Sequence, residues 1–187
     1  MHEDSYPIEQ IVRNPRTGFQ IGFARLTMRM LPDLDDVAYE ASGEGLRMLG
    51  ASELALKVPG ELVRQMHGDD VVLEAPRVRL AYRGRVCEPV MGVRASVGEA
   101  HASRVVQDLL ERGASIEEIA TAHGRCTVRA LGRLRLLLGY PDALMHLSDE
   151  TSELVMRLSH YTNARLGDDF MPARFAARDG RRGKHTH

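Results

Sequence analysis

The order in which the hydrophobic period changes between residues 88 and 162 limits the fold of this chain more than any other feature of its sequence. Apolar and β-branched residues concentrate in four short segments that predict strands: 88–96, 115–122, 125–131 and 154–158. Apolar residues recur every three to four positions in two segments that predict helices: 99–112, and 134–147 with an interruption at Gly139-Tyr140-Pro141. The resulting order β-α-β-β-α-β is that of the ferredoxin-like module. We therefore expect an α+β fold whose C-terminal part is a ferredoxin-like βαββαβ sandwich.

The first 87 residues show weaker periodicity and predict a small α+β half. Residues 1–21 contain two prolines and little pattern, which indicates an extended lead. The remaining expectations are a strand at 25–30, a strand at 37–40, a strand at 53–58, a helix at 60–67 that begins after Pro59, and a long strand at 71–82. The turn Arg83-Gly84-Arg85 leads from this half into residue 88.

Composition excludes several classes of protein. With 43% hydrophobic and 27% charged residues, the 187-residue chain has the values of a folded globular protein of one or two domains. No apolar run approaches the ~20 residues of a transmembrane helix, and the acidic N-terminus lacks the apolar segment of a secretory signal. The two cysteines, Cys87 and Cys126, have no metal-type spacing, so we expect no disulfide framework, no metal site and a cytoplasmic location.

Arginine is the unusual residue of this chain, with 23 arginines against 2 lysines. A guanidinium group binds phosphate in a bidentate manner, so clusters of arginine are candidates for RNA binding. Two stretches free of acidic residues hold the candidates: Arg77, Arg79, Arg83 and Arg85 in the first, and Arg125, Arg129, Arg133 and Arg135 in the second. The alternative interpretation is a solvated edge strand, where charge discourages aggregation.

The residues from 88 onward resemble the C-terminal domain, domain V, of elongation factor G. Four motifs occur in the family's order: Glu88-Pro89-Val90-Met91, the helix end Asp108-Leu109-Leu110-Glu111-Arg112-Gly113, Leu138-Gly139-Tyr140, and the strand end Ser159-His160-Tyr161. The resemblance implies a ferredoxin-like fold in which most of these residues fix the structure. We expect the domain to cover residues 88–162 and to be followed by a basic flexible tail, residues 163–187.

Residues 22–87 are similar, more loosely, to the preceding domain IV of the same family. Phe23 to Pro32 resembles its first strand, Val58-Pro59-Gly60-Glu61-Leu62 its helix start, and Val78 to Gly84 its hairpin. The family's helix after the proline is much longer than the one expected here, and its second helix has no counterpart, so this half would be a shortened domain IV.

The sequence contains no Gly-x-x-x-x-Gly-Lys-Ser/Thr motif, so we expect no nucleotide binding, no cofactor and no enzymatic activity. The resemblance implies a non-enzymatic ribosome-binding protein that acts in translation, by regulating elongation or protecting the ribosome. Its expected partners are the factor-binding region of the large subunit and rRNA, with no membrane.

Two other classes of function remain open at the level of sequence. Ile116 to Gly124 also fits the first helix and turn of a helix-turn-helix, which predicts a DNA-binding transcription regulator. The ferredoxin-like fold also serves as a ligand-binding or oligomerisation module in proteins unrelated to translation.

Overall fold

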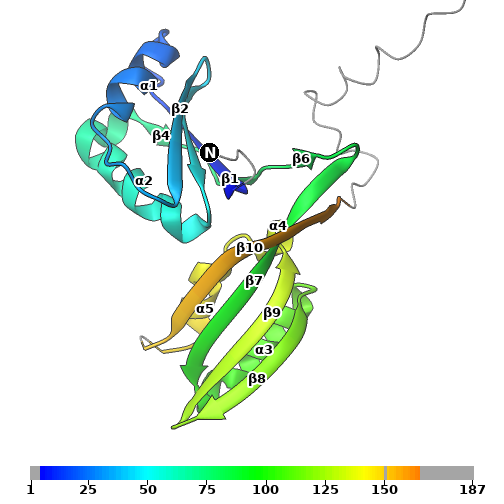
Figure 1. The fold of residues 1–187 in the computed structure, drawn as a ribbon. Coiled ribbons are helices and arrows are strands. Elements are labelled where there is room, and N and C mark those ends of the chain that lie inside the picture. The colour runs from blue at the N-terminus through cyan, green and yellow to red at the C-terminus, as the bar shows by residue number, and fades with distance from the viewer. Residues whose placement is uncertain (1–4, 150, 165–187) are drawn as a thin grey trace, which may run out of the picture.

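The computed structural model describes residues 5–149 and 151–164, and it contains two antiparallel sheets that follow one another along the chain (Figure 1). The second sheet is built from β7 (Val86–Gly98), β8 (Ser115–Ala122), β9 (Arg125–Arg133) and β10 (Glu153–Asn163). Its helices are α3 (Ala102–Glu111), α4 (Leu134–Leu137) and α5 (Tyr140–Leu147). The strand order β10-β7-β9-β8 places the first and last strands of the module side by side. This confirms the α+β class and the ferredoxin-like arrangement.

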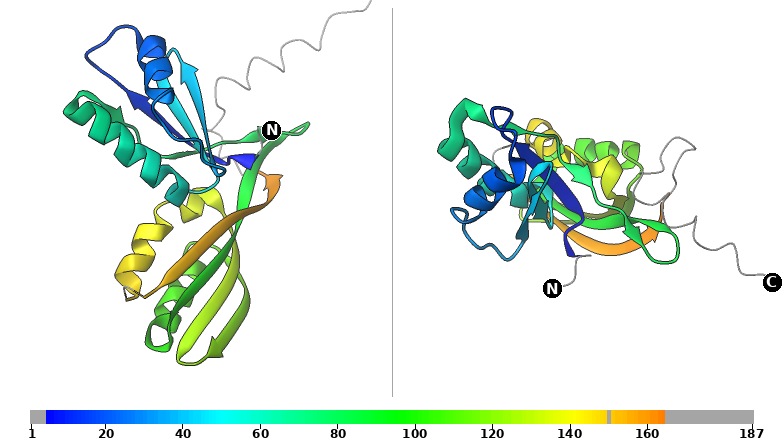
Figure 2. Two further views of the ribbon diagram at one scale, coloured as in Figure 1. Left: turned by 60° about the vertical axis from the view of Figure 1, so that its left-hand side comes forward. Right: turned by 90° about the horizontal axis from the view of Figure 1, so that it is seen from above.

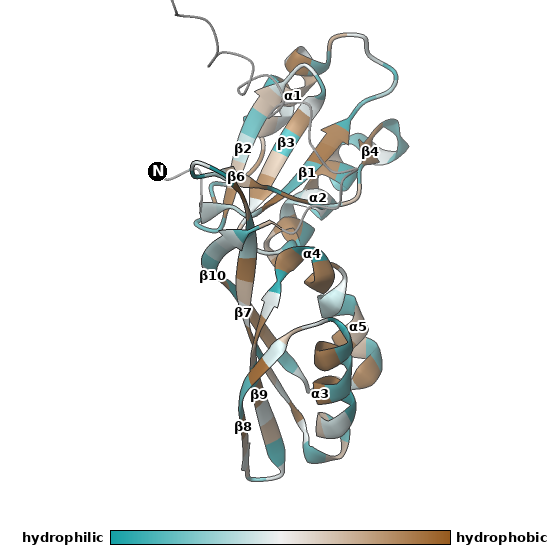
Figure 3. Ribbon diagram, turned by 90° about the vertical axis from the view of Figure 1, so that its right-hand side faces the viewer, coloured by the Kyte–Doolittle hydropathy of each residue, from teal (hydrophilic) through white to brown (hydrophobic). Residues whose placement is uncertain are grey.

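The helices cover only one face of this second sheet (Figure 3). Along β7, Val93, Ala95 and Val97 are at most 2% exposed and point into the core, whereas Arg94 between them is exposed. Successive strand residues point to opposite faces, so the pattern separates a packed face from an open one. The β8–β9 hairpin also rules out the helix-turn-helix, because residues 115–131 are strands joined by a turn rather than two helices.

The first sheet is built from the N-terminal half. Its elements are β1 (Ile8–Arg13), α1 (Gln20–Met28), β2 (Val37–Ser42), β3 (Gly45–Gly50), α2 (Glu53–His67), β4 (Val72–Leu73) and β5 (Arg77–Val78). The strand order is β2-β3-β1-β4, and β5 also pairs with β1. A two-residue strand, β6 (Ala81–Tyr82), then forms a hairpin with β7 and leads into the second sheet.

The expected extended lead, residues 1–21, is wrong where the structure describes it. Residues 8–13 form β1, a strand paired on both sides, and residues 20–21 begin α1. The strand has no clear alternation because Glu9 is buried beside Ile8, with only 7% of its surface exposed. Arg47 of the neighbouring β3 holds the Glu9 carboxylate at 2.6 Å, so the pairing partner that permits this burial lies far along the chain.

Two predicted strands are helices. The segment expected as a strand at 25–30 belongs largely to α1, whose buried residues Phe23, Ala24 and Thr27 have helical spacing. Leu26 is 63% exposed, and this exposed apolar residue gives the sequence the alternating pattern of a strand. The strand expected at 53–58 is the first half of α2, which begins at the Ser52 cap, whose hydroxyl accepts a bond from the Ala55 amide at 3.2 Å. Pro59 therefore lies inside a helix rather than at its start.

The long strand expected at 71–82 is replaced by β4, β5 and β6, each of two residues. Pro76 lacks the amide hydrogen that a continuous ladder needs, and the chain leaves the first sheet soon afterwards to join the second.

The two halves meet where α2 approaches α4 and α5 (Figure 2). Glu53 accepts a hydrogen bond from the Gly139 amide at 2.9 Å, and Lys57 lies 2.7 Å from Asp142. Burial raises the pKa of Glu53, and Asp142 adds to the shift, while the Gly139 bond and Lys57 oppose it. Both contacts are polar, and the first involves Gly139, in the segment that interrupts the predicted second helix.

Candidate nucleic-acid interface

The eight predicted phosphate-binding arginines do not form one surface. Arg133 and Arg135 both bind the carboxylate of Glu88, which is 1% exposed. Arg135 donates from its Nε to Glu88 Oε2 at 2.8 Å, and Arg133 donates to the other oxygen. A buried carboxylate requires cationic partners, so these two arginines stabilise the fold.

Three further predicted arginines also have partners within the protein. Arg125, the first residue of β9, donates to the hydroxyl and carbonyl of Ser96 and to Thr151. These bonds connect the start of β9 to the loop before β10. Arg79 donates to the Tyr6 carbonyl at 2.9 Å, and Arg77 is paired with Glu74. Arg125 and Arg79 are partly buried and held by these contacts, whereas Arg77 keeps 56% of its side-chain surface in solvent.

Arg83 and Arg85 lie at the tip of the β6–β7 hairpin, and both are exposed. The guanidinium of Arg83 lies 4.9 Å from the ring centroid of Tyr161, a residue of the family-like strand end. Together with Cys87, Thr162 and Asn163 they line a hollow of about 250 Å³. At this hairpin tip two predicted arginines face solvent.

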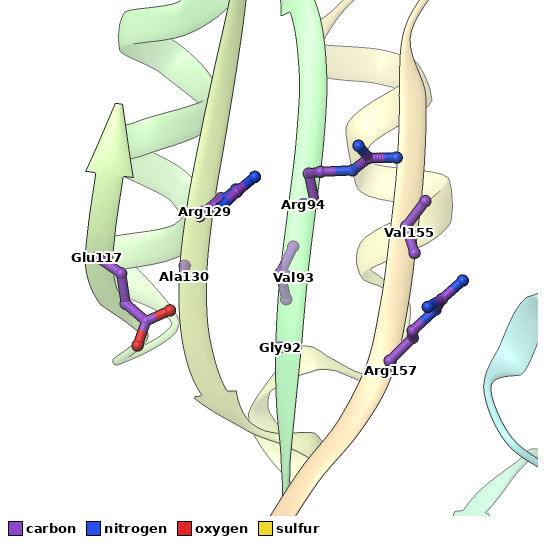
Figure 4. A pocket seen from close by; sticks show the side chains of 8 residues that line it. All are labelled: Gly92, Val93, Arg94, Glu117, Arg129, Ala130, Val155 and Arg157. Carbon is purple, nitrogen blue, oxygen red and sulfur yellow. The ribbon is translucent and has the colours of Figure 1, made fainter. Parts of the chain in front are cut away.

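Arg129 lies on a second surface, the open face of the ferredoxin-like sheet, which we define by Gly92, Arg94, Glu117, Arg129, Val155 and Arg157. A hollow of about 380 Å³ lies over this face (Figure 4). Arg94, Arg129 and Arg157 project from three adjacent strands, β7, β9 and β10. Arg129 also lies 3.2 Å from Glu118, an exposed carboxylate of β8.

The sequence-based prediction missed Arg94 and Arg157. The predicted arginines are close along the chain, whereas the open face is assembled from strands that are far apart in sequence. Strand periodicity was the available signal: Arg94 lies between Val93 and Ala95, and Arg157 lies between Met156 and Leu158. If the apolar neighbours face the core, each arginine must face away from it.

The family-like motifs at 108–113 and 138–140 meet at one structural contact. Arg112 lies 2.7 Å from Asp108, and its guanidinium lies 5.5 Å from the ring centroid of Tyr140. The same side chain reaches the carbonyls of Leu136 and Leu138 at 3.5 Å. Gly113 and Gly139 have φ of 71° and 76°, a left-handed conformation that favours glycine at the end of α3 and before α5.

Tyr140 is fully buried, and its hydroxyl has no hydrogen-bond partner among the described residues. Burial raises the pKa of Tyr140 well above its ordinary value, and Asp108 adds to this, so the hydroxyl stays protonated. We expect Tyr140→Phe to raise the free energy of unfolding by about 1 kcal/mol, because a buried unpaired hydroxyl is costly. Urea unfolding followed by circular dichroism measures the change.

Tyr6→Phe is the matched control, because the buried Tyr6 hydroxyl donates to the Asp35 carbonyl at 3.4 Å. This control should lower stability slightly or leave it unchanged. A loss of stability in Tyr140→Phe as large as about 1 kcal/mol would show that the Tyr140 hydroxyl has a partner, and the explanation above would be wrong.

Within residues 5–149 and 151–164, no group of three or more His, Cys, Asp or Glu side chains is arranged to hold a metal ion. The described helices include none that is long and apolar enough to span a membrane. The predicted basic tail, residues 163–187, lies outside the described residues apart from its first two positions.

Comparison with known proteins agrees with the fold. Residues 85–167 match the family model described as "Elongation factor G C-terminus". The chain is 29% identical over 129 residues to the large ribosomal subunit assembly factor BipA of Escherichia coli K12. The matched region covers 67% of this chain and 21% of that protein. It is 33% identical over 78 residues to the mitochondrial ribosome-releasing factor 2 of Danio rerio, which covers 42% of this chain and 10% of that protein.

A crystal structure of a protein from Thermus thermophilus is similar to 92% of this chain, over 42% of its own length, with a TM-score of 0.61 and 13% identity. At this identity the likeness concerns the fold alone. The chain spans about a fifth of the BipA sequence that it matches.

Proposed function

We propose that this chain, whose residues 85–167 match the family model of the elongation factor G C-terminus, is a non-enzymatic ribosome-binding protein that acts in translation in the cytoplasm. The observation that carries the proposal is this domain, found by family comparison and built as the expected βαββαβ sheet with α3, α4 and α5 on one face. The named relatives support it, since BipA is described as an assembly factor of the large ribosomal subunit and the Danio rerio protein as a ribosome-releasing factor.

We further propose that residues 22–87, completed by β1, form the shortened domain IV-like half. The solved structure that is similar to 92% of the chain supports a fold that continues through both halves. The expected correspondence of Phe23 to Pro32 with a first strand is wrong, because Phe23 lies in the helix α1.

The proposed partners are the factor-binding region of the large subunit and its rRNA. Arg77, Arg83, Arg85 and Arg129 remain candidates for rRNA contact, because all four are exposed. Arg125, Arg133 and Arg135 instead stabilise the domain that presents them. The absence of a Gly-x-x-x-x-Gly-Lys-Ser/Thr motif from this sequence supports a role without nucleotide binding.

Sedimentation of the tagged full chain through a sucrose gradient, with and without purified ribosomal subunits, tests this proposal. We expect the protein to move with the large subunit at low salt and to stay at the top of the gradient without ribosomes. A protein that stays at the top in both cases would contradict ribosome binding and would favour a ligand-binding or oligomerisation module.

The affinity for ribosomes should fall steeply with salt. Contact with about four phosphates predicts a slope of log affinity against log salt concentration near −3, at about 0.7 per contact. Equilibrium binding to large subunits between low and physiological salt measures this slope. An affinity that does not change with salt would exclude phosphate contacts as the source of binding.

A further inference from the structure

We propose that the open face of the ferredoxin-like sheet is a binding surface for the sugar–phosphate backbone of RNA, with Arg94, Arg129 and Arg157 as its phosphate contacts. The inference rests on the proposed function and names the surface and the chemistry by which the protein holds rRNA. Four observations on the open face support it.

The first observation is the pairing of like charges. Arg94 on β7 and Arg129 on β9 are directly opposite each other in the ladder, and Arg157 on β10 is opposite Gly92, two residues along β7 from Arg94. Residues directly opposite in an antiparallel pair have Cβ atoms about 5 Å apart, and like charges there destabilise the sheet. A bound polyanion converts this repulsion into attraction.

The second observation is that the three guanidinium groups are accessible to a ligand. Arg94 and Arg157 are exposed, and within the described part of the chain neither has a hydrogen-bond or ion-pair partner. Arg129 has Glu118 at 3.2 Å, but both side chains are more than half exposed, so this ion pair is worth little. A phosphate can therefore replace Glu118 without a large loss of stability.

The third observation concerns Gly92, which lies on the floor of the hollow (Figure 4). A glycine in the interior of a strand weakens it and often marks a place where another molecule approaches closely. Packing does not require glycine here, because a Cβ atom at this position would meet its nearest neighbours, Arg157 O and Leu131 Cδ2, at 3.8 and 3.9 Å. The missing side chain keeps the hollow open instead.

The fourth observation selects the part of RNA that is recognised. The residues that line the hollow include no aromatic side chain on which a base could stack. Guanidinium groups bind phosphate oxygens through paired hydrogen bonds. The open face should therefore contact the sugar–phosphate backbone of RNA rather than its bases, and binding should depend little on base sequence.

Fluorescence anisotropy with a labelled RNA of mixed sequence, about 20 nucleotides long, tests the proposal on the full chain. We expect Arg94→Ala and Arg157→Ala each to weaken RNA binding at least fivefold and to reduce the salt slope by about 1. Arg104→Ala is the matched control, because Arg104 is exposed on α3, on the side of the sheet that the helices cover. Equal losses in all three variants would overturn the assignment to the open face.

Gly92→Val separates binding from folding. Valine favours a strand, so we expect unchanged or higher stability together with at least fivefold weaker RNA binding. Glu118→Gln should strengthen RNA binding about twofold to threefold, because it removes the competitor of phosphate at Arg129 and costs one exposed ion pair. Wild-type affinity in Gly92→Val, with the fold retained, would contradict a ligand in the hollow.

Two further results distinguish this inference from the proposed function. If the wild-type protein binds large subunits and the Arg94 and Arg157 variants bind them equally well, the open face is wrong and ribosome binding stands. If the wild-type protein binds the RNA probe through these arginines but not the ribosome, the proposed function is wrong and the open face stands. Equal affinity for poly-L-glutamate and for the RNA probe would overturn RNA as the partner.

Discussion

Replacing Glu88 by Gln is expected to lower the free energy of unfolding by about 3 kcal/mol, the low end of the range for breaking a buried ion pair. The Glu88 carboxylate is 1% exposed and holds two guanidinium groups, those of Arg133 and Arg135. These partners keep 22% and 45% of their side-chain surface in solvent, so they recover part of their hydration when the carboxylate is lost. The cost should therefore not reach the upper end of that range.

Thermal unfolding of the Glu88→Gln variant measures this effect. For a chain of this size, a loss of about 3 kcal/mol corresponds to a decrease in Tm of about 6–12 °C. Glu118→Gln is the matched control, because Glu118 also pairs with an arginine of β9 but is half exposed, and it should change stability by less than about 0.5 kcal/mol. Equal shifts in the two variants would contradict the role given to the buried carboxylate.

The second large effect is expected at Arg112, where Arg112→Ala should cost about 2 kcal/mol of stability, as expected when a partly buried hydrogen-bonded ion pair is broken. Arg112 joins the end of α3 to the segment between α4 and α5 through Asp108 and the ring of Tyr140. Its removal leaves the Asp108 carboxylate, which is only 23% exposed, without this partner. Urea unfolding of the variant, followed by circular dichroism, measures the loss.

Arg112→Lys tests which contact matters. Lysine keeps the charge beside Asp108 but loses the planar group that lies over Tyr140 and reaches the Leu136 and Leu138 carbonyls. We expect about half of the alanine effect. A lysine variant as stable as the wild type would show that charge alone is sufficient, and the stacked contact would then contribute nothing measurable.

The C-terminal half could be predicted from sequence because its elements carry their own pattern. The stripe Val105, Val106, Leu109 and Leu110 and the stop at Gly113 are local signals, and α3 follows them closely. The β8–β9 turn at His123-Gly124 is equally local. Strands and helices of this kind can be read without knowledge of what they pack against.

The N-terminal half could not be predicted because distant residues decide its elements. Glu9 can be buried in β1 only because Arg47 of β3 neutralises it. The apolar residues Leu26 and Met30, in and just after α1, are exposed, and this hides the buried face of the helix. Tertiary context overrides local propensity in both cases.

The candidate site was predicted only in part for a similar reason. The arginines of the second cluster were found from their spacing, but whether an arginine faces solvent depends on partners elsewhere. Glu88 was the neglected signal, since a carboxylate in the apolar strand 86–98 must find cations, and it takes Arg133 and Arg135. Arg94 and Arg157 lie outside both clusters and become neighbours only when the sheet forms.

The measurement that tests the central claim most directly is binding of the labelled full chain to purified large ribosomal subunits, with and without elongation factor G held in its GTP state by a non-hydrolysable analogue. If the chain binds the factor-binding region as proposed, elongation factor G should displace it. We predict saturable binding that saturating elongation factor G abolishes. An absence of binding at low salt, or binding that elongation factor G leaves unchanged, would contradict the account.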